Sequence, residues 1–473
     1  MTTSTTNLTF GGSFNYNKNK RYNYNQSLFA SDEYPEQTSL DWRAYARFTQ
    51  RFKNAEVEEG ASSSLIKNAF YTIQADISQG YDRRWNPDHE DRFFDYGYVG
   101  KFTVYQGADY TPGFDSLTGV FGDVQQTFRD TLITFEPDTI KNPELARFTE
   151  RYYQLYGWEG FDTEGNPVYD TDRSFAFTNY NQIQQGGGLL NGDALDNVYG
   201  MWVSNNDVTN ANGSASNNYL EAVTNQVRIS GQGSADIGNH QFIVGFEYEQ
   251  RVDRSYSISP SGLWALARLN ANTHVDQLDK SNPIITYPGP SISYTRLNAS
   301  PGEYDASNDD EPQSFIDYNL RGAAGLNQDG VDFLDVYSLD PELFKLEFFS
   351  PDELYRGGVG SLVNYYGYDP YGNRASGTAS DFDAFFNERD EFGNHTRPIA
   401  PYQPIYVAGF IEDKFEFDDL IFRIGMRVDR FDANQQVLKD PFVLFPTIKA
   451  GENESFEYLA EGSTAHPGNI GED

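Results

Sequence analysis

Apolar and polar side chains alternate along several stretches of roughly ten residues, the length that a tilted strand needs to cross a membrane. In the first stretch the alternate positions are Leu8, Phe10, Gly12, Phe14 and Tyr16. A second stretch opposes an apolar row that includes Trp42 to a row that carries Arg43 and Arg47. Arginine is costly in lipid but natural beside water, so the pattern predicts strands with one lipid face and one wet face.

The same alternation predicts seven strands, which begin near residues 7, 40, 65, 222, 240, 403 and 420. Tight turns at Gly238-Asn239 and at about Asp418-Asp419 join two pairs of these strands as hairpins.

One strand of the second hairpin, 405–417, has an ambiguous pattern. Either Ala408 and Phe410 or Val407 and Ile411 could face lipid. Its register therefore stays open.

The connections between strands alternate between short turns and very long segments, 90–221 and 257–402. Barrels in outer membranes have short periplasmic turns and longer extracellular loops. The sequence therefore predicts an all-β fold: a partial antiparallel transmembrane β-barrel of about seven strands, with very long extracellular loops and a third, truncated loop over 433–473. A soluble β-sandwich or propeller would show the same alternation, but with shorter strands, evenly spaced turns or a fixed repeat.

Composition supports this reading and excludes some functions. Aromatic residues make up 16% of the 473 residues, although only 38% of residues are hydrophobic, and no apolar run is long enough for a transmembrane helix. The net charge of −35 argues against a nucleic-acid partner, and the absence of cysteine excludes disulfides and thiolate metal sites. The polar start at Met1 lacks the features of a signal peptide, so we expect the exported protein to begin upstream.

No catalytic motif is recognisable, and the five histidines have no triad or metal-site spacing. The sequence therefore predicts no enzyme. Two aromatic stretches in the long connections are candidate ligand-binding surfaces, because exposed rings stack on sugars, peptides and planar chelates. Packing within the loops is the alternative use of these rings, which are Tyr152, Tyr153, Tyr156, Trp158, Tyr365, Tyr366, Tyr368 and Tyr371.

One acidic stretch is a candidate calcium loop. Oxygen-bearing side chains alternate around Gly330, at Asn327, Asp329, Asp332 and Asp335. No glutamate closes the twelve-residue pattern of an EF-hand, and a polar turn is the alternative. We predict no other cofactor.

The stretch from Pro404 to Leu444, PIYVAGFIEDKFEFDDLIFRIGMRVDRFDANQQVLKDPFVL, is similar to the C-terminal half of TonB-dependent receptor barrels. In that family an Asp-containing strand, here with Asp413, precedes a Gly-x-Arg-x-Asp strand, here Gly425 to Asp429. FDAN at Phe431 to Asn434 resembles the large-loop, Oar-like receptors of the Bacteroidetes, as do NLTFGGSFNYN, KNAFYTIQADIS, FDYGYVGKF and GVDFLDVYSLDPELFKLEFFSPDEL.

The resemblance implies an outer-membrane transporter of a Gram-negative bacterium, with a plug, a TonB-coupling box and a barrel of about 22 strands. The sequence departs from it in lacking the plug, the coupling box and a terminal aromatic strand, so we interpret it as a fragment of a longer protein. The expected partners are outer-membrane lipid, the TonB complex through the missing N-terminal region, and a small solute or oligomer. The expected function is solute import; surface binding or adhesion without transport is the alternative.

Overall fold

The structure is a computed structural model, which describes residues 5–20, 22, 34–52, 66–152, 158–164, 167–169, 176–177, 219–260, 262–275, 277–298, 301–302, 312–356, 361–375, 382–391, 393–417 and 420–435. Antiparallel sheet dominates these residues.

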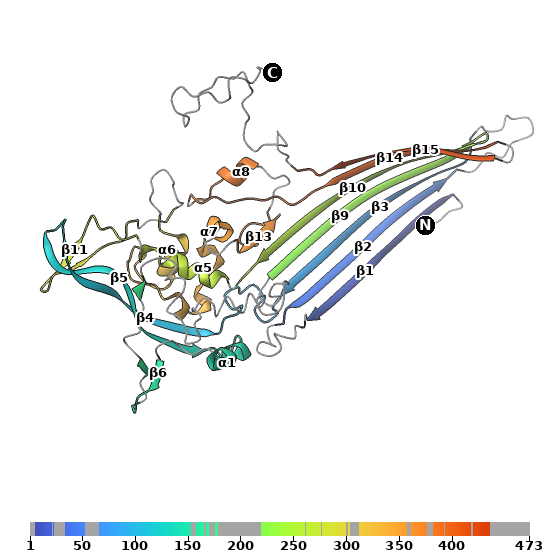
Figure 1. Cartoon of the computed structure of the whole chain (residues 1–473). Helices are drawn as coiled ribbons and strands as arrows, with labels where there is room; N and C mark the ends of the chain where they lie inside the picture. Colours follow the sequence, from blue (N-terminus) through green and yellow to red (C-terminus); the bar gives the residue numbers. More distant parts are fainter. Residues whose placement is uncertain are drawn as a thin grey trace, which may run out of the picture.

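Seven long strands form one curved antiparallel sheet (Figure 1). They pair in the order in which they occur along the chain: β1 (Thr6–Lys20), β2 (Glu36–Arg51), β3 (Ile66–Trp85), β9 (Tyr219–Ile237), β10 (His240–Ile258), β14 (Ile405–Phe417) and β15 (Leu420–Asp432). Each lies where the alternation predicts a strand. In the described residues β1 and β15 pair only with β2 and β14, so the sheet has two open edges.

The register between strands keeps the two kinds of side chain on separate faces of the sheet. Phe14 lies opposite Trp42, Ile77 opposite Val227, and Phe246 opposite Gly231. Because side chains alternate between faces with period two, these pairings form one continuous apolar face. The other face is polar and carries ion pairs such as Arg43 with Asp76.

The same register settles the strand whose orientation the sequence leaves open. Ile411 lies between Val244 and Met426, and Val407 lies opposite Tyr248. Val407 and Ile411 therefore belong to the apolar face, whereas Ala408 and Phe410 belong to the polar face.

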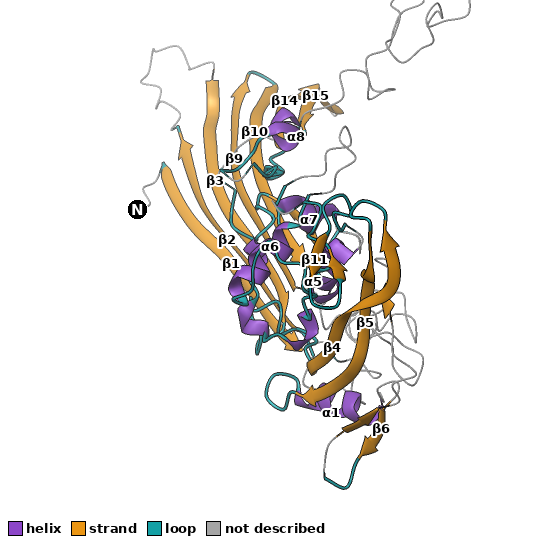
Figure 2. Ribbon diagram, turned by 90° about the vertical axis from the view of Figure 1, so that its left-hand side faces the viewer, coloured by secondary structure: helices purple, strands orange, loops and turns teal. Residues whose placement is uncertain are grey.

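The two long connections lie together at one end of the sheet, opposite the tight turn at Gly238 (Figures 1 and 2). We call their described residues, within 86–177 and 259–404, the cap. Its strands are β4 (Gly100–Asp115), β5 (Val120–Pro137), β6 (Trp158–Phe161), β7 (Pro167–Tyr169), β8 (Ala176–Phe177), β11 (Ile284–Thr286), β12 (Ser291–Ser293) and β13 (Val363–Tyr366). Its helices are α1 (Pro143–Tyr152), α5 (Gly262–Ala271), α6 (Phe315–Ala323), α7 (Pro351–Arg356) and α8 (Phe382–Asn387), with 3-10 turns η4 (Thr273–Val275), η5 (Val336–Ser338), η6 (Pro341–Leu343) and η7 (Leu346–Phe348).

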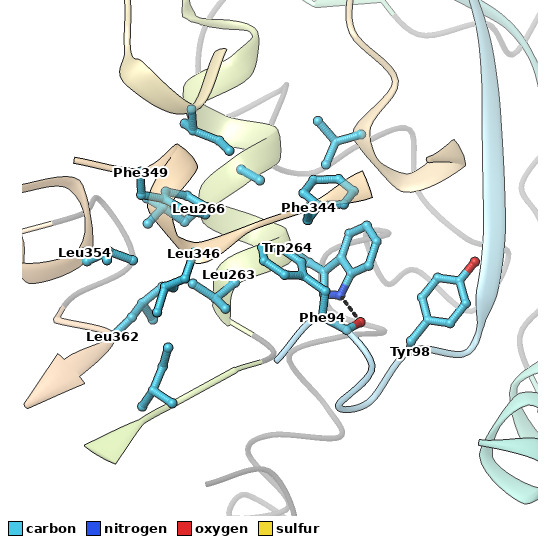
Figure 3. Close-up of a cluster of buried hydrophobic side chains, with 14 of the residues drawn as sticks. Phe94, Tyr98, Leu263, Trp264, Leu266, Phe344, Leu346, Phe349, Leu354 and Leu362 are labelled. Atoms are coloured by element: carbon cyan, nitrogen blue, oxygen red, sulfur yellow. Dashed lines mark hydrogen bonds between the residues drawn. The ribbon is translucent and has the colours of Figure 1, made fainter. Parts of the chain in front are cut away.

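Helix α5 lies at the centre of the cap, between the long sheet and the β4–β5 hairpin (Figure 2). Its sequence GLWALARLNA is apolar nearly all round, as expected of a helix that is buried on all sides. Trp264 is fully buried; its indole N–H donates to the carbonyl oxygen of Phe94 at 3.2 Å, and its ring stacks on Tyr98 (Figure 3). Phe344 packs against both Trp264 and Phe94. The two long connections thus share one hydrophobic core.

Helices α6 and α7 are joined at their N-termini by one carboxylate. Ser350 and Glu353 form a capping box at the start of α7, in which each side chain accepts the other residue's backbone N–H. The second carboxylate oxygen of Glu353 accepts the N–H of Phe315, the first residue of α6, at 2.9 Å. Burial raises the pKa of Glu353 to about 7.

Among the helices that the structure describes, none is long and apolar enough to span a membrane.

Candidate ligand-binding site

A cavity of about 580 Å³ lies where the cap meets the ends of the long strands, and we call it the mouth cavity. Five segments from different parts of the sequence line it: 91–95 beyond β3, the cap end of β9, the cap end of β10, 341–347, and 371–373. Its size is that of sites for small ligands. Each lining segment is held either by the sheet or by the shared core, so the walls of the cavity are fixed in place.

The floor of the mouth cavity is aromatic. Tyr219 and Tyr256 reach it from the sheet, and their rings lie 6.2 Å apart in an edge-to-face arrangement. Phe93 packs edge-on against Tyr219 at 5.3 Å. Phe344 and Tyr371 enter from the second long connection. The buried rings are fixed by their neighbours, so this surface is formed in advance of any ligand.

The rim of the mouth cavity is charged. Asp95 is buried and satisfied, since it accepts Arg92 and Lys141, each at 2.9 Å. The exposed rim carboxylates are Asp91, Glu342 and Glu347, of which Glu342 approaches Lys141 at 3.8 Å. Lys345 adds an exposed positive charge to the rim.

Several carboxylates lie close enough to Tyr371 to act on its pKa. Burial raises the pKa of Tyr371 above its usual value, and nearby carboxylates raise it further, namely Asp390, Glu353, Asp369 and Glu347. Its hydroxyl donates to the carbonyl oxygen of Phe349 at 3.0 Å, which holds the ring in place.

The aromatic residues predicted from the second connection divide between the core and the surface. The buried Tyr365 donates its hydroxyl to the carbonyl oxygen of Arg397 at 2.7 Å, and the buried Tyr368 donates to Glu221 at 3.0 Å. Tyr366 points to the opposite, partly exposed side of β13. Only Tyr371 of this group lines the mouth cavity. The binding role predicted for Tyr365, Tyr366 and Tyr368 stays a prediction.

The predicted residues of the first connection belong to α1, to β6 and to the segment between them. Tyr152 is the last residue of α1, and Trp158 is the first residue of β6. Tyr153 and Tyr156 lie outside the described residues.

The candidate calcium loop turns its backbone carbonyls toward the protein's own donors. Arg321 donates to the carbonyl oxygen of Asp332 at 2.8 Å, His274 contacts that of Val331 at 2.9 Å, and Gln313 donates to that of Gln328 at 2.8 Å. Burial lowers the pKa of His274 well below its usual value, so its ring is neutral and donates here. These inward carbonyls are thus already used.

The side chains of the calcium loop remain spread along its outer surface. Asn327, Asp329 and Asp332 are exposed, and Asp335 lies 3.7 Å from the buried Arg268. Within the described part of the chain, no three histidine or carboxylate side chains gather closely enough to hold a metal ion. Calcium binding by this loop stays a prediction.

Two further cavities lie on the polar face of the long sheet. One, of about 500 Å³, is lined by Arg47, Arg51 and Arg228, by Glu247, by hydroxyl and amide side chains, and by three phenylalanines, Phe70, Phe246 and Phe410. Arg228 and Arg427 both pair with Glu247, which joins β9, β10 and β15. The other, of about 570 Å³, is lined mainly by polar side chains nearer the cap. The polar face therefore has the character of a hydrated surface.

Sequence reasoning missed most of the mouth cavity, namely Asp91, Arg92, Phe93, Glu342, Lys345 and Glu347. Comparison with models of known protein families, with curated proteins and with solved structures found no match. The function is therefore inferred from the geometry of the molecule.

Proposed function

We propose that this chain is the barrel portion of an outer-membrane receptor of the TonB-dependent type, which captures a solute in the mouth cavity and imports it. The observation that carries this proposal is the two-faced sheet. Closure of the sheet into a full barrel, through further strands on the open edges of β1 and β15, belongs to the proposal.

The apolar face has no covering layer in the described residues. Large apolar side chains are exposed on it in every long strand except β2: Leu8, Phe10, Phe14, Tyr71, Ile73, Ile77, Val227, Ile229, Val244, Phe246, Val407, Ile411, Phe422, Ile424, Met426 and Val428. Phe14 and Ile424 are 72% and 66% exposed. Soluble proteins rarely leave so extended an apolar surface in water. Lipid contact accounts for it, since transfer of apolar area out of water is favourable.

Strand length and the polar face support the same function. The seven strands are 13 to 20 residues long, which exceeds the nine to eleven or so residues that a tilted strand needs to cross a bilayer. Ion pairs such as Arg228 with Glu247 occupy the opposite face, as expected of a wet lumen.

Site-directed labelling tests this assignment. Single cysteines replace Phe246 on the apolar face and Glu249 on the polar face, in the full protein in outer membranes. A lipid-soluble probe should label the Phe246→Cys variant, and a water-soluble maleimide should label the Glu249→Cys variant. Equal labelling of both positions by both reagents would refute a membrane-embedded sheet.

Surface adhesion without transport is a second candidate, favoured by the β4–β5 hairpin. This hairpin extends away from the long sheet (Figure 1) and exposes four apolar side chains at its tip, Tyr110, Phe114, Leu117 and Phe121. Such a patch is typical of protein contact surfaces. Cells that carry the Phe114→Ser and Phe121→Ser substitutions should lose surface attachment if adhesion is the function, but should keep solute uptake if import is the function.

A further inference from the structure

We propose that the mouth cavity binds a cationic group, an amine or a guanidinium on a peptide-sized ligand. This inference rests on the proposed receptor function and specifies the chemical class of its ligand. It is carried by an aromatic floor combined with a rim on which negative charge is in excess.

The floor offers rings that a cation can approach. The rings of Tyr219 and Tyr256 are held in place by the sheet, whereas Phe93 and Tyr371 are only half-buried and so remain accessible from the cavity. A cation over an aromatic face within about 6 Å is attracted by the ring quadrupole, and this attraction increases when water is excluded.

The protein already uses this chemistry beside the cavity. The guanidinium of Arg83 lies 3.2 Å from the ring centre of Trp85 and 5.6 Å from that of Tyr219. Tyr219 lines the cavity, so one of its floor rings already has a guanidinium group beside it.

The rim favours the same sign of ligand charge. The cavity lining holds four carboxylates, Asp91, Asp95, Glu342 and Glu347, and two cations, Arg92 and Lys345. Arg92 and Lys141 both pair with Asp95, and Lys141 also approaches Glu342, so the remaining cation among the described lining residues is Lys345, beside the exposed Asp91 and Glu347. An anionic ligand would meet this excess of like charge, whereas a cationic ligand would pair with it.

The test measures binding of three capped tripeptides to the full protein in detergent by calorimetry: acetylated and amidated Lys-Phe-Lys, Ser-Phe-Ser and Glu-Phe-Glu. Capping removes the terminal charges, so only the side chains differ. Lys-Phe-Lys should bind about tenfold more tightly than Ser-Phe-Ser, and Glu-Phe-Glu should bind most weakly. Raising the salt concentration should reduce the preference for Lys-Phe-Lys.

Two exposed rim carboxylates provide the variants. Asp91→Asn combined with Glu347→Gln should weaken Lys-Phe-Lys about tenfold and leave Ser-Phe-Ser unchanged. Both side chains are on the surface, so the fold is retained. Glu391→Gln, an exposed carboxylate that does not line the cavity, is the matched control and should change nothing.

Equal affinity for the three peptides, tighter binding of Glu-Phe-Glu, absence of any binding, or an unchanged double variant would each overturn the inference. Membrane embedding is judged separately by labelling at Phe246 and Glu249. The ligand class can therefore fail while the receptor function stands.

Discussion

The long sheet and the cap treat their apolar side chains in opposite ways. In the core of the cap, away from the tip of the β4–β5 hairpin, the large rings are enclosed, and Trp264, Tyr337 and Phe349 are fully or almost fully buried. In the sheet the apolar side chains point outward, and Phe10 is 72% exposed. The hydrophobic effect favours burial of such side chains. The cap achieves this burial by packing its own segments together, whereas the sheet leaves its apolar face uncovered in the described residues. Under the proposed function, the cap lies in water and the apolar face of the sheet lies in lipid.

The largest expected loss of stability follows from disrupting the buried charge network of the cap. Asp317 is fully buried and accepts Arg296 and Arg321, each at 2.7 Å. The Asp317→Asn substitution leaves two buried guanidinium groups without a counter-charge and should destabilise the cap by about 3–5 kcal/mol. Hydrogen exchange should increase in α5 and α6 but not in β9 or β10. The exposed Asp329→Asn is the control; parallel loss of protection in the sheet would contradict the separation of the two regions.

The sheet should respond to charge according to its face. Val244→Arg places a cation on the apolar face and should destabilise the protein by about 2–4 kcal/mol if the position lies near mid-membrane. Gln241→Arg places the same residue on the polar face, between Asp236 and Lys414, and should cost far less. Denaturant unfolding in lipid vesicles measures both. Equal free-energy changes would show that the two faces share one environment.

The stability of the cap should depend on pH through the titration of Glu353. Its pKa in the folded protein is about 7, above its ordinary value of 4.5, because burial disfavours the charged form. The folded state therefore binds the proton more tightly than the unfolded state. The contribution of this protonation to the free energy of unfolding is complete below pH 4.5 and is lost as the pH rises through 7. The loss should be on the order of 1–3 kcal/mol.

Amide exchange at Phe315, whose N–H is bonded to Glu353, measures this loss across the pH range after correction for intrinsic rates. Glu353→Gln should flatten the pH dependence. A Glu353→Gln variant with an unchanged slope would assign the effect to another group, while the exposed Glu347→Gln should leave the slope as it is.

The smallest effect concerns calcium. Since the inward carbonyls of the 327–335 loop are already bonded, an ion would rely on the exposed side chains of Asn327, Asp329 and Asp332. We expect binding in the millimolar range, which stabilises the cap by about 1.4 kcal/mol at tenfold the dissociation constant. Calorimetry should show saturable heat that weakens in Asp329→Asn with Asp332→Asn. Absence of heat at several millimolar calcium would leave these residues as ordinary surface.

Local pattern was sufficient to predict the long sheet. Period-two alternation identifies a strand and its faces without knowledge of its neighbours, and Gly238-Asn239 marks a turn. Val407 and Ile411 show the limit, because Ala408 and Phe410 fit the same local rule. Only pairing with β10 and β15 decides between them.

The cap could not be predicted in this way, because its contacts join distant segments. Nothing near Phe94 in the sequence indicates that it packs on Phe344 or accepts a hydrogen bond from Trp264. One signal was available: Asp317 and Arg321 stand four residues apart, the spacing of a helical ion pair. Arg321 of this pair also donates to the carbonyl oxygen of Asp332, so the acidic 327–335 loop already has a cation beside it.

The shared core of the cap also determines the order in which parts of the protein fold. Phe94 and Trp264 are separated by 170 positions, and Phe344 lies farther along the chain, so this core closes only when both connections are present on the same side of the sheet. Contacts of such long sequence separation form slowly. The strands can pair first, because β9 and β10 are adjacent in sequence. The aromatic rings of segment 93–98 therefore stay uncovered until the second connection is in place, and during that interval they can contact wrong partners.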